Sequence, residues 1–345
     1  MSITKLQKKI LDAKENKIAV CASAAALKTS TLTEKTRQLL LSGVNPSRIA
    51  VITFTRMAAQ ELINRLGDDY KDGIFIGTIH SLAAHFLSIY NLGDKIGKIA
   101  EEENFDKLFT LCQNLQLEGF FDWVLLDEAQ DSGEEELNFI FSMINPPNFF
   151  VCYDLKQSIY GFKGARPDLL QKYLTNSGAS FYSLNENFRN GANILAYAKR
   201  IIRKTGLQDD SIAMKEDDGI VQEIFYDSKK VMPYILRNGD FKDWAILTRT
   251  NAQISMLKKD LDYYGIPYNT FKQGDLNRTE LDQKMQENKV KLITIHSSKG
   301  LGFKNVLVYG AVWWNNDEYF LNYVAATRAK DLLIWAKAPA YRKKY

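Results

Sequence analysis

Short apolar runs alternate with amphipathic stretches along most of the chain. Ten of the runs are rich in β-branched residues, have the length of a strand and end at a polar turn. They cover residues 18–22, 49–53, 75–77, 123–127, 149–153, 180–184, 244–248, 290–295, 306–309 and 332–336. Helical patterns such as 58–66 and 192–202 follow most of them. This repetition of strand, turn and helix predicts an α/β fold with parallel sheets and helices on both faces.

The expected strands fit two sheets of about five strands better than one sheet of ten. A Gly- and Ser-containing stretch at 174–180 separates the first five from the last five. The sequence therefore predicts a first domain at 1–178 and a second at 179–345. Parallel α/β sheets bind ligands at the carboxyl ends of their strands, and each polar motif described below directly follows an expected strand.

Composition narrows the class of protein. A hydrophobic fraction of 46% and a charged fraction of 25% are typical of soluble globular proteins, and no apolar run approaches the ~20 residues of a membrane span. Cys21, Cys112 and Cys152 show no paired spacing, so we expect neither a disulfide framework nor a zinc site. We expect a cytoplasmic protein with no membrane partner. Because the net charge is only +4, nucleic acid would have to bind in a local groove.

Residues 18–30 read IAVCASAAALKTS, an apolar strand and a run of small residues before Lys28 and Thr29 open a helix. A phosphate-binding loop needs inward backbone N–H groups, a helix N-terminus, a lysine for the outer phosphates and a hydroxyl for Mg²⁺. Leu27 stands where that pattern has glycine, and a non-glycine residue at positive φ costs roughly 1–2 kcal/mol. The segment therefore also fits an ordinary strand-to-helix turn.

The segment VLLDEAQD at 124–131 is more specific. Asp127 and Glu128 directly follow its apolar residues, so both carboxylates lie at the carboxyl end of the expected strand. One can hold Mg²⁺ while the other polarises an attacking water. Two adjacent acids also occur in solvated turns, but Lys28 and Thr29 upstream favour the catalytic interpretation.

Six further strings follow one another along the chain. They are ITFTRMAAQEL (52–62), GTIHSLAAHFL (77–87), YDLKQSIYGFKGARP (153–167), LNENFRNGANIL (184–195), ITIHSSKGLGF (293–303) and YVAATRAK (323–330). With these strings in this order, the chain resembles superfamily 1 helicases of the UvrD/Rep/PcrA type over nearly its whole length. The resemblance implies two RecA-like P-loop NTPase lobes, each a mainly parallel sheet flanked by helices. It also implies a monomeric motor that uses ATP and Mg²⁺ to move along single-stranded DNA from 3′ to 5′.

The resemblance assigns roles at the nucleotide. Glu128 activates water, Gln157 senses the γ-phosphate, and Arg189 and Arg328 from the second lobe bring positive charge to it. ATP bound at the lobe interface would therefore draw the lobes together. Thr29 and Asp127 hold Mg²⁺. The nucleotide-binding set comprises Gln7, Ala24, Ala25, Ala26, Leu27, Lys28, Thr29, Ser30, Phe188 and Gly300.

The resemblance also implies a DNA track of aromatic faces and polar groups. The expected contacts are Phe54, Thr55, Thr78, His80, Tyr160, Phe162, Lys163, His296 and Lys299. Phe54 also fits a packing role, because aromatic residues are common in protein cores. Phe162 lies between Gly161 and Lys163 and is expected to be displayed on a turn.

The chain departs from the family pattern at several positions. Leu27 replaces a glycine, Ser30 an arginine that packs on the base, Phe188 a tyrosine, and Gly302 a glutamate expected to reach the ribose. We expect a working hydrolysis site with weaker nucleotide binding. The segment 88–121 is short for the first accessory insertion, and 271–289 leaves almost no room for the second, which favours translocation over processive unwinding.

Two alternatives stay open. One is a nucleic-acid-binding relative that has lost ATP hydrolysis, for which Leu27 is the main support. The other is a motor subunit that serves a nuclease or defence partner. No nuclease constellation is visible, and only a basic tail, AKAPAYRKKY, follows the last motif.

Overall fold

The computed structural model describes residues 3–67, 73–102, 104–238, 240–272, 276–312 and 315–337; most of the basic tail lies outside them. By their contacts these residues form two units. The first unit runs to Ala22 and then from Leu27 to Leu184. The second contains Ser23–Ala26 and the described residues from Asn185 onward. The small-residue loop expected to bind phosphate therefore belongs, by its contacts, to the second unit.

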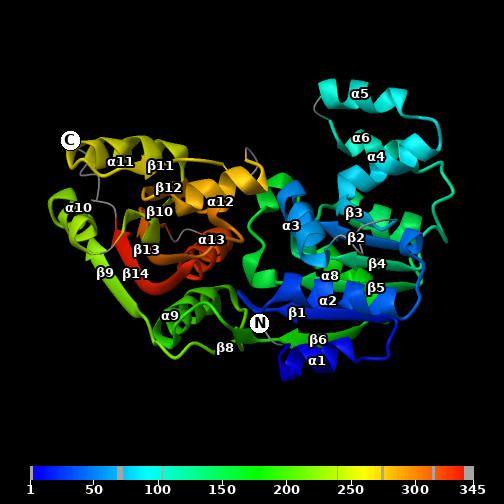
Figure 1. Cartoon of the computed structure of the whole chain (residues 1–345), viewed down its shortest axis with the longest axis horizontal. Helices are drawn as coiled ribbons and strands as arrows, with labels where there is room; N and C mark the ends of the chain where they lie inside the picture. The colour runs from blue at the N-terminus through cyan, green and yellow to red at the C-terminus, as the bar shows by residue number, and fades with distance from the viewer. Residues whose placement is uncertain are drawn as a thin grey trace. The chain divides into compact units, whose positions relative to one another are not determined.

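The first unit is built on six parallel strands. They are β1 (Lys17–Ala22), β2 (Ile49–Thr53), β3 (Phe75–Thr78), β4 (Trp123–Leu126), β5 (Asn148–Tyr153) and β6 (Ser180–Leu184). Their order in the sheet is β3-β2-β4-β5-β1-β6 (Figure 1). The helices are α1 (Lys5–Leu11), α2 (Lys28–Leu41), α3 (Arg56–Leu66), α4 (Ile79–Ile89), α5 (Asp94–Glu101), α6 (Asp106–Cys112), α7 (Glu134–Asn138) and α8 (Pro167–Asn176). Every residue of β2 is buried, as expected for a parallel strand covered on both faces.

The second unit has its own sheet of six parallel strands. They are β9 (Ile220–Phe225), β10 (Trp244–Thr248), β11 (Tyr268–Asn269), β12 (Val290–Thr294), β13 (Phe303–Tyr309) and β14 (Ala329–Lys337), in the order β11-β12-β10-β13-β14-β9 (Figure 1). A short parallel pair joins β7 (Glu186–Asn187) to β8 (Ile212–Ala213). The helices are α9 (Ala192–Ile202), α10 (Ser228–Arg237), α11 (Asn251–Tyr263), α12 (Arg278–Gln286) and α13 (Asn316–Ala326).

The expected fold class, α/β with two mainly parallel sheets flanked by helices, is confirmed. One assignment is wrong: the strand at 180–184 is expected in the second set, but β6 pairs with β1 of the first sheet, Ile18 opposite Ser180. The Gly- and Ser-containing stretch is the turn that returns the chain from α8 to this sheet, and the contacts divide only after Leu184. The second sheet also contains two strands outside the ten named above, the exposed edge strand β9 and the two-residue β11.

Each unit has a core of its own. In the first, Phe86, Phe109 and Phe139 pack with tilted or edge-to-face rings, and Phe109 on α6 brings the segment 88–121 onto this core. In the second, Trp244 and Leu257 belong to a core formed by β10, β12 and the helices beside them. Among the described residues, no helix combines the length and the apolar character that crossing a membrane requires.

Candidate nucleotide site and nucleic-acid interface

The loop between β1 and α2 has an unusual backbone. Ala25 (φ 57°) and Leu27 (φ 61°, ψ 31°) both lie in the left-handed region. Glycine reaches this region without strain, whereas in other residues it costs roughly 1–2 kcal/mol. Leu27 is the N-cap of α2, and no side chain caps the helix there. Leu27, which stands where the phosphate-loop pattern has glycine, and Ala25 therefore both have a conformation that favours glycine.

Four polar side chains meet where β1 and β4 end. Lys28 Nζ lies 3.3 Å from Glu128 Oε1, and the Thr29 hydroxyl donates to Asp127 Oδ2 at 2.8 Å. Lys28 is 8% exposed and Asp127 is 3% exposed, whereas the Glu128 side chain is 29% exposed and Thr29 is also partly exposed. The structure thus brings together the residues to which the sequence assigned phosphate, Mg²⁺ and water.

The charges of this cluster perturb one another. Burial, followed by the neighbouring Glu128 carboxylate, raises the pKa of Asp127 to about 6, although Lys28 and the Thr29 hydroxyl act in the opposite direction. Burial alone would lower the pKa of Lys28, but the carboxylates of Glu128, Asp154 and Asp127 outweigh burial and raise it. The cluster therefore holds more negative charge than its one lysine neutralises.

This donor set fits Mg²⁺. Mg²⁺ prefers oxygen ligands and usually keeps several waters while it binds one or two carboxylates and substrate phosphates. Asp127 and Thr29 offer a carboxylate and a hydroxyl, and the raised pKa of Asp127 marks charge that a cation would stabilise. In the part of the chain that the structure describes, no group of three His, Cys, Asp or Glu residues could hold a metal. The ion would thus share its coordination with phosphate and water.

Gln130 is a site residue that the sequence reasoning missed. It is fully buried, its Nε2 donates to Glu128 Oε2 at 2.6 Å, and its Oε1 accepts from Asp154 N at 2.9 Å. Asp154 Oδ2 in turn accepts from Gln157 Nε2 at 2.7 Å. A continuous chain of hydrogen bonds therefore runs from Glu128 to Gln157. The only signal in the sequence is the place of Gln130 inside VLLDEAQD.

Gln7 is buried rather than open. Its Oε1 accepts from Thr4 N at 3.0 Å, and its Nε2 donates to Thr31 Oγ1 at 2.9 Å. The Thr31 hydroxyl donates to the Leu27 carbonyl at 3.0 Å. Gln7 is thus connected to the end of the loop, while Ser30 on α2 is half-buried.

The aromatic residues expected to contact DNA form one cluster in the first unit. The Phe54 and Tyr160 rings stack at 5.1 Å with an interplanar angle of 27°. Lys163 Nζ lies 5.3 Å from the Tyr160 ring centre and 6.0 Å from that of Phe162. The Phe162 side chain is 70% exposed, as expected for a ring displayed on a turn, whereas Tyr160 is buried.

The polar DNA candidates of this unit lie at helix starts. The Thr55 hydroxyl accepts from Ala58 N at the start of α3, and the Thr78 hydroxyl caps α4. His80 Nδ1 lies 3.3 Å from Glu136 Oε1, and burial raises the pKa of Glu136. A cavity of about 10 Å³, room for one water, is lined by Phe54, Thr78, His80 and Asp127 among others. The DNA candidates thus adjoin the carboxylate cluster.

The second unit brings together Arg189, Arg328 and Gly300. Arg189 Nη1 donates to the Thr327 carbonyl at 3.2 Å, and its Nη2 donates to the Gly300 carbonyl at 3.5 Å. Arg328 is 1% exposed, and its Nη1 donates to the Leu301 carbonyl at 3.0 Å. Both guanidinium groups are therefore held by backbone carbonyls of the segments around 300 and 327.

Gly302 makes room for Arg189. A Cβ at this position would lie 2.8 Å from Arg189 Nε and 3.2 Å from its Cδ, so the Arg189 side chain would have to shift. The glycine that replaces a glutamate of the family pattern thus removes a side chain and also lets the guanidinium lie over the backbone.

The remaining DNA candidates, His296 and Lys299, follow β12. His296 begins a short 3₁₀ turn and is half-buried, while Lys299 is only 6% exposed. The Thr294 hydroxyl accepts from Ser297 N at 3.2 Å and fixes this turn. Both residues lie in the second unit, whereas Phe54, Tyr160, Phe162 and Lys163 lie in the first.

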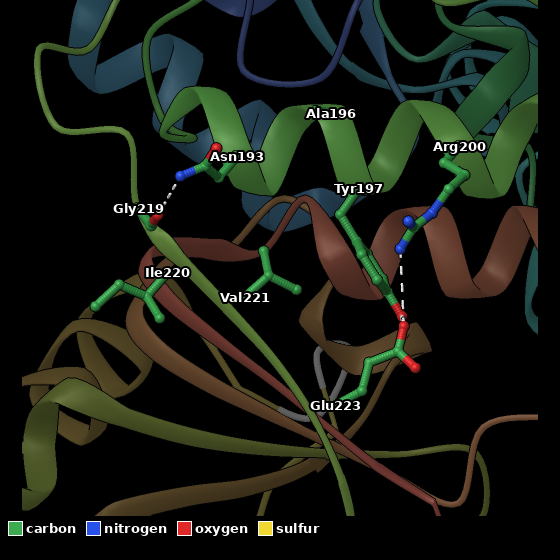
Figure 2. A pocket seen from close by; sticks show the side chains of 8 residues that line it. All are labelled: Asn193, Ala196, Tyr197, Arg200, Gly219, Ile220, Val221 and Glu223. Carbon is green, nitrogen blue, oxygen red and sulfur yellow. Dashed lines mark hydrogen bonds and ion pairs between the residues drawn. The ribbon is translucent and has the colours of Figure 1, made fainter.

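A hollow of about 540 Å³ lies between α9 and β9 (Figure 2). Its polar groups bind one another: Tyr197 OH donates to Glu223 Oε1 at 3.0 Å, and Arg200 Nη2 lies 3.7 Å from the same oxygen. Asn193 Nδ2 donates to the Gly219 carbonyl at 3.0 Å. None of the residues predicted from the sequence lines this hollow. The lysine, hydroxyl and carboxylates that phosphate chemistry needs lie together at the ends of β1 and β4, which therefore remain the candidate centre for it.

Two family models match the chain in succession. The model described as the UvrD/REP helicase N-terminal domain matches residues 3–118 and 114–177. The model described as the UvrD-like helicase C-terminal domain matches residues 182–281 and 272–338. The boundary between the two matches lies close to Leu184, where the contacts divide.

Individual relatives are more distant and longer. The "Probable DNA helicase II homolog" of Mycoplasma capricolum is 24% identical over 73% of this chain and 49% of its own length. DNA helicase II of Escherichia coli is 21% identical over 78% of this chain and 51% of its own length. One subunit of the ATP-dependent helicase/nuclease of Oenococcus oeni is 37% identical over 26% of this chain and 8% of its own length. This chain thus spans about half the length of these relatives or less. Because the two family models together cover nearly all of it, the chain belongs to the UvrD/REP helicase family.

Proposed function

We propose that this chain is an ATP-dependent motor of the DNA helicase class that moves along single-stranded DNA. The observation that carries the proposal is the partly buried cluster in which Lys28 lies 3.3 Å from Glu128 and Thr29 donates to Asp127 at 2.8 Å. A lysine, a hydroxyl and two carboxylates at the carboxyl edge of a parallel sheet are the groups that ATP hydrolysis uses. Family membership and relatives named DNA helicase II support DNA as the track.

In this proposal the phosphates bind at the loop after β1 and at the start of α2. Lys28 and the backbone from Ala24 to Leu27 contact them, and Thr29 and Asp127 would hold Mg²⁺. When bound, Mg²⁺ neutralises charge on the phosphate oxygens. Glu128 orients the attacking water and accepts its proton. Gln7 Oε1 and Nε2 each make one bond and keep a second lone pair and a second N–H for an adenine edge, but the residue is only 3% exposed, so its side chain would have to become accessible.

The arginines have unequal access to a phosphate. Arg189 is half-buried and donates to carbonyls at 3.2 and 3.5 Å, so it can exchange these long bonds for a phosphate oxygen. Arg328 is 1% exposed and would have to leave a buried position to do the same. We therefore assign direct charge neutralisation at the γ-phosphate to Arg189 first and to Arg328 second.

DNA binding is assigned to the aromatic cluster. Bases stack on aromatic faces whatever their sequence, and a nearby lysine attracts the phosphate backbone. Phe162 is the exposed ring, Phe54 and Tyr160 form the stacked pair behind it, and Lys163 lies over both Tyr160 and Phe162. The hydrogen-bond chain from Glu128 through Gln130 and Asp154 to Gln157 ends three residues before Tyr160, a route by which the nucleotide state can reach the DNA contacts.

ATP hydrolysis by purified wild-type protein and by Lys28→Ala tests the proposal. We expect turnover only in the wild type and stimulation by single-stranded DNA above the levels with RNA or without nucleic acid. No turnover in either protein would support a nucleic-acid-binding relative that does not hydrolyse ATP. An ATP turnover rate that is the same with and without single-stranded DNA would contradict movement along DNA.

The finer properties need separate measurements. Movement from 3′ to 5′ predicts a faster arrival signal from a fluorophore at the 5′ end than from one at the 3′ end. We expect a monomer in light scattering with DNA bound. Because one stretch matches a protein named as part of a helicase/nuclease, a nuclease partner is a second candidate, and co-purification of a nuclease with the tagged chain would support it.

A further inference from the structure

The loop before Lys28 is held in a costly conformation without glycine. Ala25 and Leu27 both have positive φ, at 57° and 61°. Such conformations persist only where the surrounding structure enforces them. The contacts of Ser23–Ala26 with the surrounding residues must therefore enforce this backbone conformation.

Among the described residues, three hydrogen bonds connect this loop to the residues after Leu184, and a fourth, from Ala26 N to the Ser23 carbonyl at 3.2 Å, closes the loop on itself. Asn187 Nδ2 donates to the Ala24 carbonyl at 3.0 Å, and Phe188 N donates to the Ala25 carbonyl at 3.4 Å. Ser23 Oγ donates to Asp209 Oδ1 at 3.4 Å. These bonds agree with the assignment of Ser23–Ala26 to the second unit by its contacts.

Asn187 makes the shortest of the three bonds and is itself fixed in place. It is fully buried, and its Oδ1 accepts from Arg189 N at 3.0 Å and from Asn190 N at 2.8 Å. Its Nδ2 also donates to Asn190 Oδ1 at 2.8 Å, and Asn190 Nδ2 donates to the Thr327 carbonyl at 3.2 Å. The orientation of the amide is thus determined by the segment that carries Arg189.

The bond to Ala24 also orients the loop. In a trans peptide the carbonyl and the N–H of the next residue point in opposite directions. When Asn187 holds the Ala24 carbonyl, the N–H of Ala25 is turned to the opposite side. Inward backbone N–H groups are what a phosphate loop needs.

We propose that Asn187 is a positioning residue that holds the Ser23–Ala26 backbone in its phosphate-binding shape and compensates for the glycines that this loop lacks. The inference rests on the proposed nucleotide binding by this loop. It also connects the loop to Arg189 through a single side chain.

The test is ADP binding, measured by calorimetry with Mg²⁺ present. Asn187→Ala is expected to bind ADP about tenfold more weakly, equivalent to ~1.4 kcal/mol. Asn185→Ala is the matched control, because Asn185 lies on the same segment and its amide bonds to Asp210 instead of the loop. The control is expected to bind as the wild type does.

A second substitution separates positioning from folding. Leu27→Gly added to Asn187→Ala should recover most of the lost affinity, because glycine adopts a positive φ without strain and needs no enforcing contact. A purely structural role of Asn187 within the second unit would not be rescued by a change in the loop. If Asn187→Ala does not fold, Asn187→Asp replaces it, because its carboxylate keeps the acceptor contacts with Arg189 N and Asn190 N and lacks the donor.

The outcomes are distinct. If wild-type protein does not bind ADP, the proposed function itself fails. If the wild type binds and Asn187→Ala binds equally well, the inference is overturned. It is also overturned if the loss occurs but Leu27→Gly does not restore binding.

Discussion

Replacing Lys28 by alanine should change stability in a pH-dependent way as well as abolish ATP hydrolysis. Lys28 is 8% exposed and lies 3.3 Å from Glu128, with Asp127 and Asp154 also close enough to raise its pKa. Removing it leaves the buried Asp127 and the partly exposed Glu128 without this cation, while Asp154 keeps Lys156 at 3.3 Å. Breaking a fully buried ion pair costs about 3–5 kcal/mol, and the 29% exposure of Glu128 places the expected loss below that range.

The pH dependence follows from Asp127. Its pKa is raised from 3.8 to about 6, so the folded state holds a proton that the unfolded state has released, and stability falls as pH rises through this interval. Two pKa units correspond to about 3 kcal/mol at a pH above both values. Lys28 lowers this pKa, so its removal raises it further, and each added unit costs about 1.4 kcal/mol more near neutral pH. The pKa of Lys28 itself is raised above 10.5, so its own titration contributes nothing below that pH.

The free energy of unfolding should therefore be measured at about pH 5.5 and about pH 8, where Asp127 is mainly protonated and mainly ionised, respectively. Urea denaturation in EDTA, with hydrogen exchange of the β1 and β4 amides as a local reporter, serves this purpose. Lys35→Ala is the control, because Lys35 is buried on the same helix, lies over the Trp123 ring and has its pKa lowered by burial. We expect Lys28→Ala to lose more stability at the higher pH and Lys35→Ala to lose similar amounts at both. Equal losses for Lys28→Ala would refute this account of the cluster.

Three further substitutions test the assigned roles. Phe162→Ala should weaken single-stranded DNA binding by about 1–3 kcal/mol. Because the ring is 70% exposed, the substitution should not reduce stability. Fluorescence anisotropy measures the binding, with Phe225→Ala, another exposed ring, as the control. Glu128→Gln should lower kcat for ATP hydrolysis by about 10²–10⁴ while ADP binding is retained, so a parallel loss of ADP affinity would contradict its role as base. Arg189→Ala should lower kcat by about 10³ or more in steady-state assays, and an unchanged kcat would exclude it from the phosphate.

The sequence predicts the buried strands well because parallel strands covered on both faces are apolar throughout. The predictions for residues 49–53 and 244–248 are confirmed, and every residue of both strands is buried. The edge strand β9 escapes prediction because its exposed pattern includes Gln222 and Glu223 and gives no continuous apolar run. The assignment of β6 fails for another reason: the choice of sheet depends on pairing with β1, a contact distant in sequence.

The candidate site likewise contains residues that the sequence predicts and residues that it does not. Lys28, Thr29, Asp127 and Glu128 were predictable, because each follows a strand and the carboxyl ends of parallel strands lie at one edge. The buried amide side chains of the site could not be predicted from the sequence. An amide such as Gln130 acquires its role from partners that only the tertiary structure supplies, and polar residues near apolar runs carry no sign of burial.

The two sheets share one plan. Without its edge strand β6 the first sheet reads β3-β2-β4-β5-β1, and without its edge strand β11 the second reads β12-β10-β13-β14-β9, so β9, β10 and β12 correspond to β1, β2 and β3. The same hydrogen-bonded turn also follows the corresponding strands β2 and β10. Thr53 ends β2 and its hydroxyl donates to the Thr55 carbonyl at 2.9 Å, and Thr248 ends β10 and donates to the Thr250 carbonyl at 3.1 Å. Thr55 and Thr250 then cap the helices that follow.

What differs between the units is the chemistry at equivalent positions. The N-cap of α2, Leu27, makes no side-chain bond, so the helix N-terminus remains available to a phosphate. Its counterpart α10 is capped by the Asp227 carboxylate, which accepts from Lys229 N at 3.0 Å and already places a negative charge there. Gly310 follows β13, where Asp127 follows β4. We therefore expect one nucleotide per chain in calorimetry with a non-hydrolysable ATP analogue, and a stoichiometry of two would show that the second unit binds phosphate by another route.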